Sequence, residues 1–281
     1  KLAPSSAKIL FDPGKEVESA VEIAKKADVV ILGLGEKQGI SGENFDRMTL
    51  DLPGNQQELM EAVVATGKPM VLVLLNGRPL SIPWAAEHVP AILEAWYPAE
   101  FGGLAIAETI FGKNNPSGKL TVSFPKHVGQ VPVNYNHFPT KDKKYVEGDM
   151  NPLFVFGHGL SYTTFRYSGL KAASPAPGTK QDVELTFTLE NTGERAGTEV
   201  VQAYVRKPFA SVATPIKALK AFDRVALEPG EKKTVTLRIK QDDLALWNAK
   251  CRWEIEPGKY VVSVGGSSAA DMTTTFEIPK P

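Results

Sequence analysis

The first 160 residues alternate between helix-like and strand-like runs of apolar side chains. Residues 15–27 place apolar side chains at helical spacing, and the continuous apolar run at 29–34 has the length of a strand covered on both faces. The alternation continues with helices expected at 53–65 and 104–111 and strands at 70–75, 92–96 and 119–124. Residues 1–160 are therefore predicted to form an α/β sandwich with a mostly parallel sheet and helices on both faces.

The hydrophobic pattern changes in the second half of the chain. Apolar and polar residues alternate in short runs, each bounded by turn residues, at 183–190, 199–205, 233–239 and 259–264. Such runs predict an all-β sandwich over residues 161–281. Trp247 and Trp253 are interpreted as core or sheet-covering aromatics of this domain rather than as a sugar platform, because large aromatic side chains dominate sandwich cores.

The composition narrows the range of partners and cofactors. The 281 residues suffice for one large or two ordinary domains, and 32 basic residues balance 32 acidic ones, which gives no reason to expect nucleic acid or an anionic membrane as a partner. No apolar run reaches the length of a bilayer span, and no signal sequence is visible. The single cysteine, Cys251, excludes an internal disulfide. No cluster has the spacing of metal ligands, so neither a metal nor a cofactor is expected.

A polar, glycine-rich loop at residues 33–53 is the candidate for chemistry. It follows the first strand-like run, and the carboxyl end of a buried strand is where α/β folds usually place their functional groups. The loop carries two glutamates, Glu36 and Glu43, and the charge pair Asp46 and Arg47 is expected to anchor it. A solvated surface loop is the simple alternative. A dinucleotide-binding turn is disfavoured, because the third glycine of GxGxxG is misplaced and no helix begins there.

Four segments of the chain resemble one known family. Residues 41–56, SGENFDRMTLDLPGNQ, are similar to the SGExxDRxxLxLPxxQ segment of family 3 glycoside hydrolases, which are exo-acting β-glucosidases and β-xylosidases. Residues 66–80, 96–125 and 152–165 resemble three further motifs of that family in the same order. The second half resembles the fibronectin type III-like domain that closes many of these enzymes. The nearest resemblance is to bacterial periplasmic β-glucosidases, which implies a periplasmic or secreted protein.

The resemblance implies that the chemistry is divided between two domains. Retaining hydrolysis needs one carboxylate as nucleophile and a second carboxyl group as acid and then base. The family's acid/base is the glutamate of the SGE motif in several members, which implies this role for Glu43, with Glu36 as the second candidate. The family's nucleophile is an aspartate on a (β/α)8 barrel that this sequence does not contain. The resemblance therefore implies a barrel partner, as upstream sequence or as a separate chain, and a sandwich domain whose first strand lies outside this sequence.

The proline-rich segment at residues 125–151 is unusually long for an irregular stretch inside a domain. It is interpreted either as a strap that holds the α/β domain to a neighbour or as a rim on the aglycone side of the substrate pocket, with Tyr135 and His137 as candidate rim residues. The expected substrate is a β-linked glucoside or oligosaccharide, with β-xylosides as the alternative, and a homodimer is a possible assembly. The rival hypothesis is a non-catalytic carbohydrate-binding or scaffolding fragment.

Overall fold

The computed structural model describes residues 2–140 and 144–280, which form two compact units. Each unit is built from several stretches of the chain. The α/β unit contains the chain up to Asn114, Phe124–Pro132 and Asn151–Leu153, and the β-sandwich unit contains Asn115–Ser123, Val133–Met150 and the chain from Phe154 onward. The two units are therefore interleaved along the sequence, whereas a single boundary at residue 160 remains a prediction.

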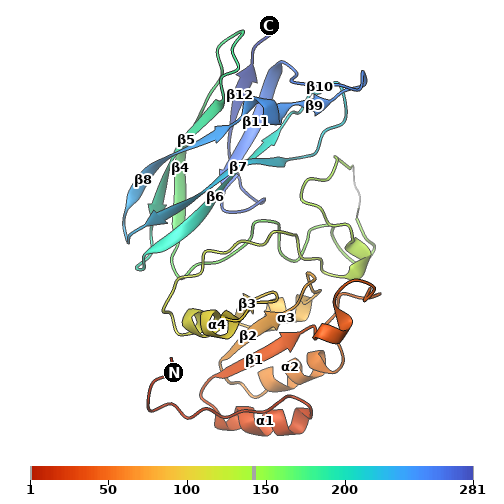
Figure 1. The fold of residues 1–281 in the computed structure, drawn as a ribbon, viewed down its shortest axis with the longest axis vertical. Helices are drawn as coiled ribbons and strands as arrows, with labels where there is room; N and C mark the ends of the chain where they lie inside the picture. Colours follow the sequence, from red (N-terminus) through yellow and green to blue (C-terminus); the bar gives the residue numbers. More distant parts are fainter. Residues whose placement is uncertain (1, 141–143, 281) are drawn as a thin grey trace. The chain divides into compact units, whose positions relative to one another are not determined.

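The α/β unit is organised around a three-stranded parallel sheet in the order β1-β2-β3 (Figure 1). Parallel neighbours cannot be joined by a tight turn, so helices connect them. The elements of this unit are α1 (Val17–Lys26), β1 (Val30–Gly35), the 3-10 helix η1 (Gln38–Ile40), α2 (Gln56–Val64), β2 (Met70–Leu75), α3 (Pro83–His88), β3 (Ala91–Glu94), α4 (Gly102–Ile110) and the 3-10 helix η2 (Val128–Gln130).

Helices lie on both sides of this sheet, which confirms the predicted α/β class. In Figure 1, α1 and α2 lie on one side of the sheet and α4 lies on the other. Helix α2 turns one apolar face inward, because Leu59, Met60 and Val63 are buried while its charged residues are not. Strand β2 is the centre of the sheet, and its Leu72 and Leu74 are almost completely buried.

Three local expectations for the first half of the chain are wrong. Helix α3 was not expected, since six residues are too short for a clear helical period, although its first residue, Pro83, is a favoured helix start. Residues 119–124 form no strand, and only Phe124 makes a single bridge pairing. Strand β1 is not covered on both faces by the described residues, because Ile31 is 52% exposed.

The β-sandwich unit consists of antiparallel sheets, as the alternating pattern predicts (Figure 1). One sheet has the order β12-β11-β6-β7, the other has the order β4-β5-β8, and β9 and β10 form a separate two-stranded sheet. The elements are β4 (Phe165–Ala173), β5 (Val183–Asn191), β6 (Gly197–Arg206), β7 (Ala218–Leu227), β8 (Lys232–Ile239), the 3-10 helix η3 (Gln241–Leu244), β9 (Leu246–Trp247), β10 (Trp253–Glu254), β11 (Gly258–Gly265) and β12 (Met272–Ile278).

The core of the sandwich is formed by alternate residues of facing strands. Every second residue of β5, from Val183 to Asn191, is buried, and β6 and β11 contribute further buried apolar side chains. The aromatic part of this core includes Tyr260 and Phe276, whose rings stack with centroids 5.2 Å apart. Period-two burial of this kind is the physical basis of the sequence prediction.

The two tryptophans of this unit do not belong to that core, so their predicted role is wrong. Trp247 is 53% exposed and Trp253 is 70% exposed. They lie on the β9–β10 hairpin, which is hydrogen-bonded to neither large sheet. The sequence expectation failed because residue type alone does not show that the hairpin carrying both tryptophans lies outside the two large sheets.

The proline-rich segment is divided between the two units. In the α/β unit, the buried side chain of Gln130 accepts a hydrogen bond from the Lys126 N–H at 2.7 Å and donates one to the Asn151 carbonyl at 3.1 Å. In the β-sandwich unit, the Ile216 N–H donates to the His137 carbonyl at 2.9 Å. Each half is thus hydrogen-bonded within its own unit, and both the strap and the rim interpretation remain predictions. Residues 141–143 of this segment lie outside the described residues.

Candidate active site

Three polar residues meet at the carboxyl ends of the parallel strands. Glu36 follows directly after β1, Asn76 follows directly after β2, and Glu94 is the last residue of β3. Since the carboxyl ends of parallel strands lie along one edge of a sheet, these residues line the edge from which loop 36–53 departs.

The turn that begins this loop is held by a glycine and by a side chain from α2. Gly35 has φ 137°, and a Cβ atom there would lie 2.1 Å from the carbonyl oxygen of Leu75, so only glycine fits. The side-chain amide of Gln56 accepts from the Gly35 N–H at 2.7 Å and donates to the Gly35 carbonyl at 2.9 Å. Gln56 is the last residue of the SGENFDRMTLDLPGNQ segment, and this clamp explains its place there.

Glu36 is a buried anchor for the loop. Its side chain is inaccessible to solvent, and its Oε1 accepts hydrogen bonds from the guanidinium groups of Arg47, at 3.0 Å, and Arg78. Its Oε2 accepts a longer hydrogen bond from the Gly77 N–H at 3.4 Å. Two guanidinium cations and one backbone N–H therefore surround the Glu36 carboxylate. Their interactions compensate the free energy that this carboxylate loses when it is removed from water.

The two arginines extend this anchor along the loop. Arg78 also donates to the backbone carbonyls of Ile40, at 3.0 Å, and Phe45. Arg47 donates to the carbonyl of Asp51 at 2.8 Å. The network therefore fixes the loop on both sides of residue 43.

Glu43 has the opposite setting. It is exposed, and it takes part in none of the hydrogen bonds or ion pairs found among the described residues. Its neighbours Gly42, at φ 134°, and Asn44, at φ 64°, both adopt positive φ, and the Phe45 N–H donates to the Gly42 carbonyl at 3.2 Å. Glu43 therefore lies at the tip of a tight turn whose base is anchored, and its carboxyl group is free to meet another molecule.

The expected pair of Asp46 and Arg47 does not form. Arg47 is directed to Glu36 and to the Asp51 carbonyl, and Asp46 is exposed without a side-chain contact among the described residues. The loop-support function suggested for Arg47 corresponds to these contacts. Arg78 was missed because its partner lies 42 positions earlier in the sequence; the only signal was a polar Asn-Gly-Arg sequence directly after a buried strand.

A second carboxyl group at this edge was also missed by the sequence analysis. Oε1 of Glu94 accepts a hydrogen bond from the Trp96 N–H at 2.9 Å, and Oε2 accepts one from the amide of Asn76 at 3.3 Å. Burial outweighs these hydrogen bonds and raises the pKa of the Glu94 carboxyl to about 7. Asn76 is completely buried, also donates to the Arg78 carbonyl at 2.8 Å, and so links Glu94 to the arginine that anchors the loop.

This raised pKa predicts how the stability of the chain depends on pH. The Glu94 carboxyl has a pKa of about 7 when folded and a usual value of 4.5, so between these values the folded state holds a proton that the unfolded state has released. The free energy of unfolding should therefore fall as the pH rises from 5 to 8, by ~2 kcal/mol after allowance for partial solvation of the group. Glu94→Gln should remove this fall.

Urea unfolding of both variants across this pH range checks the prediction. Glu100→Gln, at an exposed glutamate of the same unit, is the matched control, and its free energy of unfolding should fall with pH as steeply as that of the wild type. If the free energy of unfolding of Glu94→Gln fell equally steeply with pH, another group would be responsible.

The candidate rim residues pack on the β-sandwich unit. The ring of Tyr135 stacks on Phe156 with centroids 4.3 Å apart, and its hydroxyl accepts a hydrogen bond from the Leu219 N–H at 3.2 Å. His137 is exposed, and its Nδ1 lies 2.8 Å from the Phe138 carbonyl. These contacts account for both residues within the unit, and a rim function for them remains a prediction.

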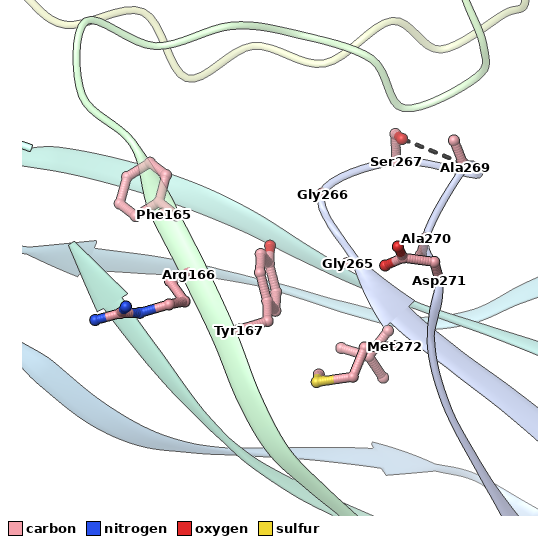
Figure 2. Close-up of a pocket in the computed structure, with 11 residues that line it drawn as sticks. Phe165, Arg166, Tyr167, Gly265, Gly266, Ser267, Ala269, Ala270, Asp271 and Met272 are labelled. Carbon is pink, nitrogen blue, oxygen red and sulfur yellow. Dashed lines mark hydrogen bonds between the residues drawn. The ribbon is translucent and has the colours of Figure 1, made fainter. Parts of the chain in front are cut away.

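The β-sandwich unit also contains a shallow pocket of about 440 Å³ between the start of β4 and the β11–β12 turn (Figure 2). Figure 2 shows the hydroxyl of Tyr167 directed toward the turn, and this buried hydroxyl has no hydrogen-bond partner among the described residues. Burial raises the pKa of Tyr167. Asp271 is the one carboxylate among the lining residues, and glycine, alanine and serine line much of the rest. The pocket offers no paired acid and base.

Among the helices of the described residues, none is long and apolar enough to cross a membrane. Within residues 2–140 and 144–280, no group of three or more His, Cys, Asp and Glu side chains could hold a metal ion.

Comparison with protein families gives a match in each half of the chain. Residues 7–162 match the glycosyl hydrolase family 3 C-terminal domain, and residues 199–268 match the fibronectin type III-like domain. The chain is 44% identical to a β-xylosidase of Formosa agariphila, covering 96% of this chain and 39% of that protein. It is 42% identical to a periplasmic β-glucosidase of Salmonella typhimurium, covering 95% of this chain and 36% of that protein. The chain thus spans less than half the length of these relatives.

Solved structures give the same picture. A β-glucosidase from Erythrobacter marinus superposes with a TM-score of 0.88 at 40% identity, covering 98% of this chain and 38% of that chain. A β-glucosidase from Listeria innocua in complex with glucose superposes with a TM-score of 0.86 at 36% identity, covering 94% of this chain and 38% of that chain.

Proposed function

Because this chain belongs to glycosyl hydrolase family 3, and carries its C-terminal domain and a fibronectin type III-like domain, we propose that it is part of a retaining exo-β-glycosidase. Its substrates are β-glucosides, cleaved at the non-reducing end. This chain supplies the general acid/base, Glu43, and a (β/α)8 barrel outside this sequence supplies an aspartate nucleophile.

The observation that carries this proposal is the contrast between the two loop glutamates. An acid/base must present a free carboxyl oxygen to the glycosidic oxygen and later to water. Glu43 has such a carboxyl group at the tip of an anchored turn. Glu36 has its oxygens occupied by Arg47, Arg78 and a backbone N–H, so it is the poorer candidate.

The mechanism then follows the two steps of retaining hydrolysis. In the first, the aspartate attacks the anomeric carbon while the protonated carboxyl group of Glu43 gives its proton to the leaving oxygen, so the aglycone departs as an alcohol. In the second, the Glu43 carboxylate takes a proton from water, and that water releases the sugar from the aspartate. The two carboxyl groups must then lie about 5–5.5 Å apart.

A general acid needs a poorly solvated or negatively charged setting to keep its proton near neutral pH. The exposed tip at Glu43 lacks such a setting within the α/β unit. The pocket of the barrel is proposed to supply it, because closure of the loop over that pocket would remove water and bring the nucleophilic carboxylate close.

The remaining features of the function are drawn from the relatives. β-Xylosides are the second substrate class, supported by the Formosa agariphila relative at 44% identity. A periplasmic location is supported by the name of the Salmonella typhimurium relative. A non-catalytic fragment remains the rival, and an activity measurement separates it from the proposal.

The test is a reconstitution assay with aryl β-glucosides and β-xylosides. The chain is assayed alone and after fusion to the remainder of the Salmonella typhimurium relative in place of the matched region. Hydrolysis by the fusion but not by the chain alone is the expected result. Hydrolysis by the chain alone would place the nucleophile within these residues, and a folded but inactive fusion would favour the non-catalytic rival.

A further inference from the structure

The β9–β10 hairpin holds two exposed indole rings in a fixed arrangement. Trp247 and Trp253 are directly opposite each other across this antiparallel pair, so their side chains project from the same face. Their ring centroids are 5.5 Å apart with an interplanar angle of 64°. Two adjacent exposed indole rings form a contiguous apolar patch, and covering it with a ligand would remove a large apolar area from water.

The hairpin is closed by hydrogen bonds that keep this arrangement in place. The Asn248 N–H donates to the Arg252 carbonyl at 3.0 Å, and the Cys251 N–H donates to the Asn248 carbonyl at 3.0 Å. The Asn248 amide donates to Glu254 at 2.6 Å. A preformed surface of this kind binds a ligand with little loss of side-chain freedom.

Beside the rings lies an open pocket of about 650 Å³, a size usual for small-molecule sites. Trp253 is the one aromatic residue in its lining, and Ala245 and Ile255 are the other apolar residues. The charged side chains that line it come from β7, β10, the 3-10 helix η3 and the loop before β5, and they are Lys180, Lys220, Asp242, Asp243 and Glu254. The pocket therefore combines one aromatic ring with hydrogen-bond donors and acceptors of both signs.

We propose that this pocket is a binding site for a neutral glucan chain, and the choice of a β-linked chain rests on the proposed function. A pyranose ring of the β-gluco type has flat faces of C–H groups that stack on an indole, and its equatorial hydroxyls point outward to side chains that donate or accept hydrogen bonds. Trp253 supplies the stacking surface, and the surrounding carboxylates and ammonium groups bind the hydroxyls.

The charges of the pocket argue for a neutral ligand. Three carboxylates and two ammonium groups line it, so an anionic polymer such as nucleic acid would be repelled by the larger number of like charges. An apolar peptide would leave these charged groups without partners when it covered them. A polyhydroxylated neutral ligand satisfies both donors and acceptors.

All residues that line this site belong to the β-sandwich unit, whereas Glu43 belongs to the α/β unit. The consequence of this site for the enzyme is that a polymeric substrate is held near the protein between cleavage events, which raises the local concentration of chain ends. Small aryl glucosides, which occupy only one sugar site, gain nothing from it.

The experiment measures binding of the full chain to soluble glucans by affinity electrophoresis and by the shift of tryptophan fluorescence. A β-1,3-glucan and a β-1,4-glucan are the probes, and an α-1,6-glucan is the negative control. We expect retardation by the β-glucans, a loss of affinity of about tenfold in Trp253→Ala, and partial recovery in Trp253→Phe. Phe209→Ala removes another exposed aromatic of the same unit, at 89% exposure, and should bind as the wild type does.

Several results would overturn the proposal. These are equal retardation of wild type and Trp253→Ala, equal retardation by α- and β-glucans, or no binding to either β-glucan. Self-association of the chain that Trp253→Ala abolishes would identify a second copy of the chain as the occupant instead. In the active fusion, Trp253→Ala should leave kcat/KM for an aryl β-glucoside unchanged, so a failure of this site and a failure of the proposed acid/base are distinguished.

Discussion

Replacement of Glu43 by alanine in the active enzyme should slow the hydrolysis of β-glucosides with poor leaving groups by about 10²–10⁴-fold, the usual contribution of a positioned acid/base. Aryl glucosides with good leaving groups need little protonation to depart, so their first step should be affected far less. The glycosyl-enzyme would then accumulate, since the second step lacks the base that activates water.

Added azide should restore turnover of the aryl substrate and yield a β-glycosyl azide. This anion needs no general base, and it can enter the space that the glutamate side chain leaves. Retention of the β-configuration follows because both displacements invert the anomeric carbon. Product analysis by NMR, together with the rates for the two substrate classes, makes the measurement.

The matched control is Asp46→Ala. Asp46 is an exposed carboxylate of the same loop, three residues from Glu43, and has no side-chain contact among the described residues. Its loss should leave both rates and the azide response nearly unchanged. Equal losses on both substrate classes in Glu43→Ala, without azide rescue, would exclude Glu43 as the acid/base.

The second large effect is expected at the anchor of the loop. Arg78→Met keeps the apolar stem of the side chain but removes one of the two cations that face the buried carboxylate of Glu36. It also removes the donors to the carbonyls of Ile40 and Phe45. Because a buried charge is left with less compensation, the free energy of unfolding should fall by about 3 kcal/mol.

Urea unfolding measures this loss, and hydrogen exchange locates it. Amide exchange should accelerate over residues 36–51, whereas the amides of α2 should change only through the global loss of stability. In the active enzyme the variant should lose kcat, since a loop that is not anchored presents the acid/base in many orientations.

The exposed pair of Lys25 and Glu22 provides the control for this prediction. The Lys25 Nζ and Glu22 Oε1 atoms are 2.8 Å apart, a shorter distance than the 3.0 Å between Arg47 and Glu36. Both side chains of this pair are nevertheless more than half exposed. Lys25→Met should therefore change stability by less than ~0.5 kcal/mol. Similar losses in Arg78→Met and Lys25→Met would show that burial of Glu36 contributes little.

Much of the architecture follows from local sequence patterns. The continuous apolar run of β2 and the period-two alternation of β5 predict a parallel and an antiparallel sheet, because strand periodicity records which faces are buried. The sequence also predicts where the polar loop 33–53 lies. A glycine-rich polar stretch directly after a buried strand must leave the sheet at the carboxyl end of that strand. The hydrogen bonds between Gln56 and Gly35 follow from no local pattern, because the two residues are 21 positions apart in the sequence.

The tertiary structure alone decides which of these polar residues are free and which are anchored. Glu36 and Glu43 are equivalent by sequence pattern. In the folded chain Arg78, from the loop after β2, lies beside Glu36, whereas Glu43 is exposed. Glu94 acquires its raised pKa because folding removes it from water beside Asn76. Trp247 and Trp253 are exposed because their hairpin lies outside both large sheets of the sandwich. Hydrophobic periodicity is a local property of the chain, whereas burial and ion pairing depend on residues that only folding brings together.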